Sequence, residues 1–291
     1  MRYRISHITE YAYQDTVGLC HNRLCLTPIS SPQQKCISSE IKIIPAPDDF
    51  NYRKDFFGNT LAFFSTYKEH DHLQVTSISE VDLTGRPKAD QAFRCPVLWQ
   101  DVDRLYDDDK AEYDIFQYTL PSRFIHLSVP IKSFAEGCFI EDATLWAACN
   151  TLMQKIYKTI EFKQGFTTIN TPVEDVVTNK KGVCQDFAHL MISCLRSMGI
   201  AARYVSGYIE TNPPPGKEKL TGTDASHAWV SVFFPTVGWV EFDPTNCLLP
   251  TYKHINVAFG RDYDDVAPLK GIVFSSGKQN LMVKVDVVRL D

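Results

Sequence analysis

The segment that decides the fold is residues 182–189, which read GVCQDFAH. From this segment onward, apolar side chains recur at spacings of three and four, as they do on the buried face of a helix. These side chains are Phe187, Leu190, Met191, Cys194, Leu195 and Met198. Gly199 follows, at the position where helices commonly end. The sequence therefore predicts a helix over Val183–Met198 with Cys184 at its start.

Cys184 stands where a helix leaves its first backbone N–H groups without partners. The positive end of the helix dipole stabilises a thiolate there, and the same N–H groups can accept a developing oxyanion. Gly182 would let an acyl group approach without meeting a Cβ atom. The alternative is that Cys184 is a small buried hydrophobic side chain, a common state of cysteine. A base nearby in space would favour the nucleophile.

His227 is the candidate base. It begins a strand predicted over residues 227–234, and the turn Pro235–Gly238 leads into a second strand over residues 239–242. Because the strand follows a long loop at Thr211–Asp224, we expect the His227 side chain at a sheet edge facing a cleft. The same loop is expected to cover that cleft.

Asp243 is the candidate partner of His227. It precedes Pro244, which favours an extended backbone at the end of the strand. From there its carboxylate could accept the Nδ1–H of His227 and fix the tautomer, as the acid of a catalytic triad does. Glu241 shares the expected face of the strand and is the rival orienting acid.

The rest of the chain divides by pattern into three parts. Residues 1–130 hold alternating and β-branched segments broken by turn formers, which predict an antiparallel β domain. Residues 131–250 hold helices, one of them over 143–160, followed by strands that include 202–209. Residues 251–291 end in a strand that packs back on the body. The predicted fold class is α+β, with the nucleophile-bearing helix packed on an antiparallel sheet.

Four motifs in this order are similar to those of the transglutaminase-like superfamily, and the closest resemblance is to its bacterial branch of cysteine proteases. The motifs are residues 182–189, 202–208, 226–229 and 238–246, and residues 55–59 and 260–266 extend the likeness beyond the core. The resemblance implies a papain-related core with Cys184 as nucleophile, His227 as base and acid, and Asp243 as orienting residue.

The chain departs from the animal transglutaminases on both sides of the cysteine. Those enzymes carry Gln before the nucleophile and Trp after it, where this chain has Val183 and Gln185. The Trp contributes an indole N–H to the oxyanion, so its absence argues against protein crosslinking. The backbone N–H of Cys184 is then the most secure oxyanion donor, and Gln185 is a candidate for the second. The chain carries no EF-hand signature, so calcium dependence is not implied.

Composition excludes several other classes. The net charge is −5 and no basic stripe is present, which argues against nucleic acid as a partner. No apolar run approaches the roughly 20 residues of a membrane span, and the amino terminus does not resemble a secretory signal. The nine cysteines are odd in number and lack metal-site spacing, which favours reduced thiols in a cytoplasmic protein with no metal and no cofactor.

The sequence leaves three hypotheses for function. The favoured one is cysteine-dependent acyl transfer at an amide bond with water as acceptor, on a peptide or protein substrate, with catalytic residues Cys184, His227 and Asp243. The second is a protein-glutamine transglutaminase, in which an amine is the acceptor. The third is a non-catalytic scaffold that binds peptides. Retention of all three residue types favours an enzyme over the scaffold. The oligomeric state stays open, because an exposed strand edge could pair.

Overall fold

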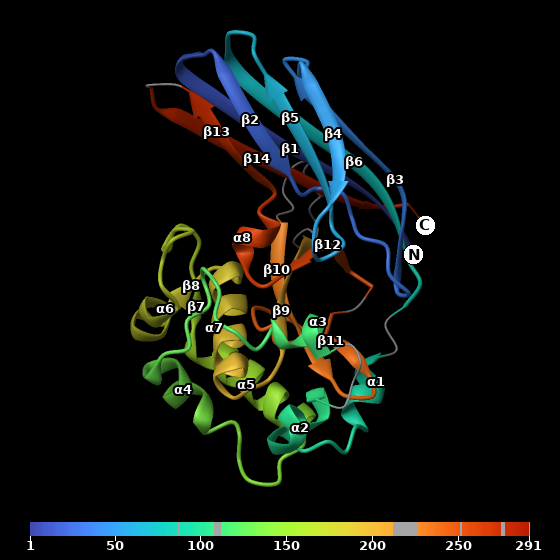
Figure 1. The fold of residues 1–291 in the computed structure, drawn as a ribbon, viewed down its shortest axis with the longest axis vertical. Coiled ribbons are helices and arrows are strands. Elements are labelled where there is room, and N and C mark those ends of the chain that lie inside the picture. Colours follow the sequence, from blue (N-terminus) through green and yellow to red (C-terminus); the bar gives the residue numbers. More distant parts are fainter. Residues whose placement is uncertain (86–87, 108–111, 212–225, 251, 275–276, 291) are drawn as a thin grey trace, which may run out of the picture.

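A computed structural model of the chain describes residues 1–85, 88–107, 112–211, 226–250, 252–274 and 277–290. It confirms the predicted α+β class: a β domain lies at one end of the molecule and a mixed core of helices and sheet lies at the other (Figure 1). The Thr211–Asp224 loop, which we expect to cover the cleft, falls outside the described residues except for Thr211.

The β domain consists of two four-stranded antiparallel sheets, ordered β14-β1-β6-β3 and β13-β2-β5-β4. Apolar side chains from both sheets, among them Val17, Leu24 and Phe64, form a core between them. The strands are β1 (Arg2–Val17), β2 (Leu19–Leu24), β3 (Gln34–Ile44), β4 (Asp49–Lys54), β5 (Thr60–Thr66), β6 (His70–Leu83), β13 (Leu269–Phe274) and β14 (Gln279–Arg289).

The carboxyl-terminal residues contribute to both halves of the molecule. The expected final strand is present as β14, which pairs with β1 from Tyr3 to Tyr13. β13 completes the second sheet of the β domain by pairing with β2. β12 (His254–Gly260), in contrast, pairs with β9 of the core. The core sheet therefore continues beyond residue 250, where the sequence patterns had suggested that the core ends.

The core packs helices against an antiparallel sheet ordered β11-β10-β9-β12. α7 (Cys184–Ser197) lies against β10, and its predicted apolar side chains are buried, except that of Met198, which follows the helix and is partly buried. The other elements are α1 (Lys88–Phe93), η1 (Trp99–Asp101), α2 (Val102–Asp107), α3 (Glu112–Phe116), α4 (Val129–Glu136), α5 (Leu145–Thr159), β7 (Glu161–Phe162), α6 (Val173–Asn179), β8 (Lys181–Gly182), β9 (Ala202–Ile209), β10 (Ser226–Phe234), β11 (Gly238–Phe242) and α8 (Tyr263–Val266).

The β domain and the core share one continuous apolar cluster and several buried polar contacts. The imidazole Nδ1 of His7, on β1, lies 2.8 Å from the hydroxyl oxygen of Tyr208, on β9. The Asn59 side chain exchanges hydrogen bonds with the backbone of Phe259 at 2.7 and 2.9 Å. These contacts hold the two halves in a fixed relation.

Two further observations bear on the class of protein. No helix in the described part of the chain is long and apolar enough to cross a membrane. All nine cysteines, which all lie among the described residues, are free thiols, and six of them are buried. Cys184 is one of the three that solvent partly reaches, with Cys36 and Cys247.

Candidate active site

The start of α7 is fixed by the side chain of Asp186. Its carboxylate accepts the backbone N–H of Val183 at 2.7 Å and the hydroxyl of Thr167 at 2.5 Å. A Cβ atom on Gly182 would lie 2.8 Å from this carboxylate. The glycine is therefore needed for the helix cap, whereas the sequence had suggested that it clears a path for an acyl group. The cap places Cys184 in the first turn, as predicted.

The structure places His227 close to Cys184 and at the expected sheet edge. His227 pairs with Gly207 of β9, whereas β11 pairs with β10 only at Val230–Phe234, so among the described strands β9 alone lies beside His227. The His227 side chain is nevertheless only 8% exposed. The Cys184 side chain lies close enough to the imidazole to raise its pKa.

Asp243 accepts a hydrogen bond from the Nε2 of His227 at 2.8 Å. The sequence had predicted that Nδ1 would donate this hydrogen bond, so the imidazole ring has the opposite orientation to the one predicted. Nε2 is the nitrogen farther from the histidine backbone, and Asp243 approaches from beyond the end of β11. Cys184 lies at the start of α7, which packs against β10.

This arrangement favours the protonated form of His227. Burial lowers the pKa of the imidazole, but the hydrogen bond that it donates to Asp243 and the neighbouring Cys184 side chain outweigh burial and raise the pKa to about 10. The imidazolium can therefore serve as a proton donor beside the Cys184 sulfur at neutral pH.

The Asp243 carboxylate is fully buried and accepts five hydrogen bonds. Oδ1 accepts the backbone N–H groups of Thr245 and Asn246 at 3.0 and 3.2 Å. Oδ2 accepts from the Asn246 amide at 2.8 Å, from His227, and from the Nε2 of His254 at 3.0 Å. Burial raises the pKa of the carboxyl, but the bonds from the two histidines outweigh it and hold the pKa well below its usual range.

Glu241, the rival acid, has different partners. Its carboxylate accepts the indole N–H of Trp229 at 2.9 Å and the amide of Asn256 at 2.7 Å. Trp229 is fully buried, and its ring centroid lies 5.7 Å from that of His227 and 5.1 Å from that of His254. Glu241 therefore anchors the tryptophan that supports the two imidazoles, and Asp243 is the acid that contacts His227.

The sequence patterns missed His254 and Asn246. His254 begins β12, and only the pairing of β12 with β9 brings it to the site. The ligand atoms of His227, Asp243 and His254 lie within 4.8 Å of one another, close enough for a metal ion. The Nε2 atoms of both histidines lie within hydrogen-bonding distance of the Asp243 carboxylate. Hydrogen bonds therefore explain the close grouping of the three residues without an ion. The expectation of a metal-free site stays a prediction.

Other nearby residues have structural roles. The amide of Gln185, the candidate second oxyanion donor, donates to the carbonyl of Ile169 at 3.4 Å. His189 is buried, and its Nε2 accepts the backbone N–H of Tyr263 at 3.2 Å. Burial lowers the pKa of His189 to about 3, so it is neutral at pH 7. Tyr204 is also buried, against His189 and Tyr263.

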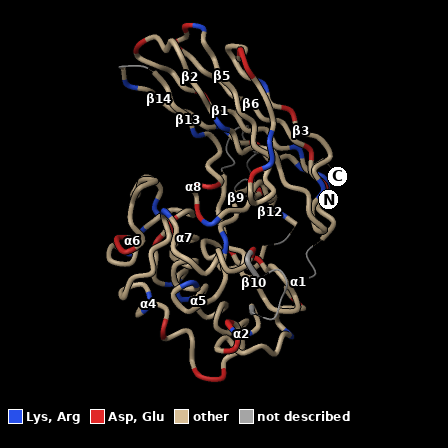
Figure 2. Tube along the Cα trace, in the orientation of Figure 1, with Lys and Arg blue, Asp and Glu red and all other residues tan. Residues whose placement is uncertain are grey.

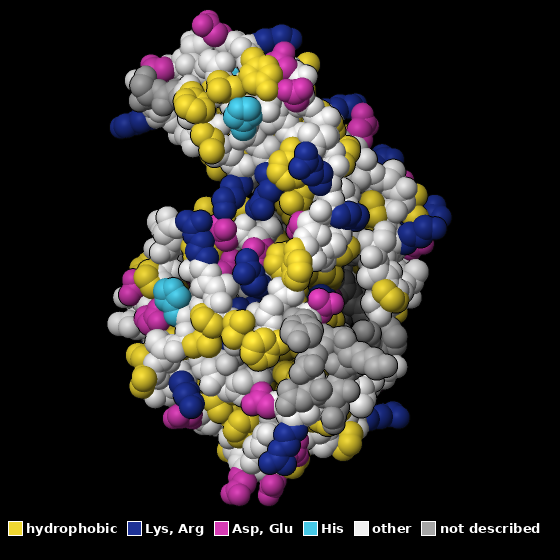
Figure 3. Space-filling view, viewed as in Figure 1, with side chains coloured by type: hydrophobic (Ala, Val, Ile, Leu, Met, Phe, Trp, Pro, Cys, Tyr) yellow, Lys and Arg dark blue, Asp and Glu magenta, His cyan; other side chains and the backbone are white. Residues whose placement is uncertain are grey.

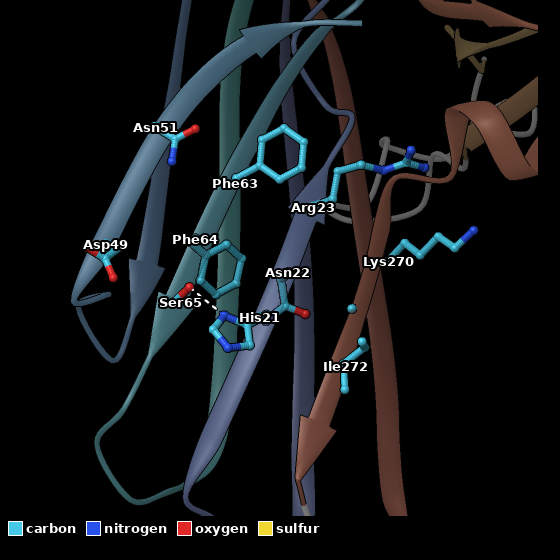
Figure 4. A pocket seen from close by; sticks show the side chains of 11 residues that line it. His21, Asn22, Arg23, Asp49, Asn51, Phe63, Phe64, Ser65, Lys270 and Ile272 are labelled. Atoms are coloured by element: carbon cyan, nitrogen blue, oxygen red, sulfur yellow. Dashed lines mark hydrogen bonds between the residues drawn. The ribbon is translucent and has the colours of Figure 1, made fainter.

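A separate hollow of about 460 Å³ lies on the outer face of the sheet β13-β2-β5-β4. Figure 4 shows that Arg23, Phe63 and Lys270 extend from three of its strands. Arg23 donates to the carbonyl of Asp264 at 3.0 Å, and Lys270 and Arg123 bind its carboxylate at 2.7 and 3.0 Å. Figure 2 shows basic and acidic positions of the chain trace close to α8.

Comparison with known proteins identifies the family of the chain. Residues 132–244, which include Cys184, His227 and Asp243, match the transglutaminase-like superfamily, and residues 3–82 match the bacterial transglutaminase-like N-terminal region. An uncharacterized protein of Mycobacterium tuberculosis strain H37Rv is 38% identical over 298 residues, with 99% of this chain and 92% of the relative covered. An uncharacterized protein of Mycobacterium leprae is 32% identical, with 99% of each covered.

The crystal structure of a candidate cysteine protease from Cytophaga hutchinsonii has the same fold. The TM-score is 0.78 at 20% sequence identity, with 100% of this chain and 91% of that chain covered. A protein-glutamine gamma-glutamyltransferase of Pseudomonas aeruginosa is 40% identical over 73 residues, which is 24% of this chain and 11% of that protein. The chain belongs to the transglutaminase-like superfamily and carries the N-terminal region of its bacterial members.

Proposed function

We propose that the protein is a cysteine-dependent enzyme that cleaves amide bonds by acyl transfer. The Cys184 thiolate attacks the carbonyl carbon, His227 gives its proton to the leaving amine, and the C–N bond breaks to leave a thioester. His227 then takes a proton from water, whose oxygen attacks the thioester and releases Cys184 with the carboxylic acid. The observation that carries this proposal is the hydrogen bond between His227 and Asp243, together with the position of Cys184 beside His227 in the first turn of α7.

Water is the acceptor that we favour. An aromatic side chain that would donate to the oxyanion is replaced by Gln185, and the amide of Gln185 contacts Ile169. The backbone N–H of Cys184, at the end of the helix dipole, is left as the main donor. Transfer to an amine is the second candidate, because part of the chain is similar to a protein-glutamine gamma-glutamyltransferase.

The two acceptors give different products from one substrate. A glutamine-containing peptide and a peptide with a glutamyl-lysine isopeptide bond are each incubated with the protein, with and without a dansylated amine, and read by mass spectrometry. Hydrolysis gives the free acid, whereas transamidation gives the dansyl adduct. Cys184→Ser should abolish either product. If the wild type changes neither peptide and does not cleave a general protein substrate, the scaffold hypothesis takes precedence.

We further propose that the substrate is a peptide or protein that the β domain helps to bind, in the cytoplasm. Arg23 and Lys270 line the hollow, and the carboxylate of Asp264 joins Lys270 to Arg123 of the core. Figure 3 shows Lys and Arg side chains on both sides of the indentation between the two halves, although the chain as a whole is acidic. An acidic segment of the substrate fits these charges. The free thiols fit a reducing compartment.

A further inference from the structure

We propose that His254 is a positioning residue of this site, which acts on His227 through the Asp243 carboxylate that the two imidazoles share. The inference rests on the proposed function for its catalytic consequence, and on the hydrogen bond between the Nε2 of His254 and Asp243, at 3.0 Å, for its geometry. The ring centroids of His254 and His227 lie 6.1 Å apart, and Asp243 is the group to which both are hydrogen-bonded.

Both histidines contact the same oxygen of the Asp243 carboxylate. The Nε2 atoms of His227 and His254 lie 2.8 and 3.0 Å from the same Oδ2, with the Asn246 amide at 2.8 Å as a third donor. Three donors saturate one carboxylate oxygen, so the carboxylate cannot rotate without losing several hydrogen bonds in a buried site. His254 itself is 1% exposed.

The His254 ring is held from a second direction. Trp229 packs edge-on against it, with an interplanar angle of 87° and the centroids 5.1 Å apart. The indole is fixed in turn by its hydrogen bond to Glu241. Across β9, His227 pairs with Gly207, and Gly207 pairs with Asn256 two residues after His254. Strand pairing and the tryptophan therefore set the position of the His254 nitrogen before any substrate binds.

The charges around His227 determine the sign of the effect. α7 contributes Cys184, the segment after β11 contributes Asp243, β12 contributes His254, and Glu241 lies behind Trp229. The N–H of His254 donates a hydrogen bond to the same Asp243 oxygen that accepts the proton of His227. Without this donor, more of the negative charge on that oxygen acts on His227, so the pKa of His227 should rise further. The carboxylate would also be held in place by one hydrogen bond fewer.

His254→Phe removes the donor and keeps a ring against Trp229, and His254→Gln restores an N–H donor. We expect the phenylalanine variant to lower kcat roughly 10- to 100-fold with little change in KM, as for other partners that orient a functional side chain. Its activity should fall at a higher pH than that of the wild type. The glutamine variant should recover most of the loss. His7→Phe, at a buried histidine that contacts Tyr208 and Thr9, is the matched control.

The second readout does not need an active enzyme. NMR titration of ¹⁵N-histidine-labelled protein gives the His227 ring pKa directly, and His254→Phe should move it upward by roughly half a unit or more. A control variant at His7 should leave it unmoved. If His254→Phe lowers the melting temperature but shifts neither the His227 titration nor the pH profile, His254 is merely structural and the proposal is wrong. A shifted titration in a protein without amidase activity would instead refute the proposed function and retain the positioning role.

Discussion

Asp243 accepts hydrogen bonds at both carboxylate oxygens while lying entirely out of solvent. A buried carboxylate is costly unless its charge is compensated, and the five donors supply that compensation. The same bonds keep the group ionised, so it can stabilise an imidazolium at His227. The single residue thus links the two strands β10 and β12.

Asp243→Asn tests this link at the residue scale. The amide keeps the size of the side chain but lacks the negative charge, so the His227 pKa should fall from about 10 toward its ordinary value. The alkaline limit of activity should move to lower pH, and kcat should drop by roughly 10²- to 10⁴-fold. Glu241→Gln is the matched control, because Glu241 contacts Trp229 and Asn256 instead. An unchanged pH profile in Asp243→Asn would contradict the assignment.

The three candidate catalytic residues could be predicted from the sequence because each sits in a local pattern. Cys184 opens a helix, His227 opens a strand, and Asp243 precedes a proline. His254 could not, because its role depends on pairing between β12 and β9, whose residues His254 and Ile209 are 254 − 209 = 45 positions apart. The orientation of the His227 ring also lies beyond sequence patterns, because it depends on the direction from which Asp243 approaches.

At the scale of elements, the sheet beneath the site is shaped by one glycine. A Cβ atom on Gly207 of β9 would lie 2.2 Å from the carbonyl oxygen of Ile255 and 2.4 Å from the Trp229 ring. Neither neighbour can move freely, since one is backbone of the adjacent strand and the other is fully buried. Glycine is therefore required for Trp229 to lie across β9 and support the histidines.

Gly207→Ala should for this reason lower the free energy of unfolding by roughly 1–3 kcal/mol and reduce activity by more than the loss of folded protein explains. Urea denaturation with an activity assay on the folded fraction measures both effects. Gly18→Ala is the matched control, because a Cβ atom there meets nothing within 4 Å. We expect it to change stability by less than about 0.5 kcal/mol. Equal stability of the two variants would show that Trp229 can shift.

Periodicity predicted the core elements closely and the β domain less completely. α7 and β9–β11 each carry their own apolar pattern, and the structure confirms them to within a residue or two. In the β domain the alternating residues near the amino terminus belong to one long strand, β1, which extends from Arg2 to Val17. Polar and charged positions interrupt its alternation, and pairing with β6 and β14 on either side holds it extended.

At the scale of the whole molecule, buried neutral histidines link stability to pH. Burial lowers the pKa of His7 to about 4 and that of His189 to about 3, below the value of about 6.5 in an unfolded chain. The unfolded state therefore binds more protons between these values. Each histidine contributes stability that is present above pH 6.5 and lost as the pH falls toward 4.

We expect the free energy of unfolding to fall by about 2 kcal/mol for each of these two histidines between pH 7 and pH 5. Urea denaturation at the two pH values measures the difference. His7→Phe should lose less stability on acidification than the wild type, whatever its stability at pH 7. A pH dependence identical to that of the wild type would mean that His7 is not the buried, neutral group described here.

The relation between the two halves gives a further prediction. If the β domain binds an acidic part of the substrate, Arg23→Glu combined with Lys270→Glu should weaken binding of a fluorescein-labelled octaglutamate by roughly fivefold or more. Fluorescence anisotropy at low and high salt measures the binding, with octaserine as the neutral probe. Lys132→Glu, an exposed change on α4 in the core, is the control. Equal binding of both probes by the wild type would refute an acidic preference.

The central claim is that Cys184 is the nucleophile and that His227 activates it. The most direct measurement is the rate of alkylation of each cysteine by iodoacetamide from pH 5 to 10, read by peptide mass spectrometry. Cys36, whose pKa is raised by burial, and Cys247 are the partly exposed internal references. At pH 6 we expect Cys184 to react roughly 100-fold faster than Cys36, and His227→Ala to abolish the difference. Equal rates at every pH in the wild type would contradict the claim.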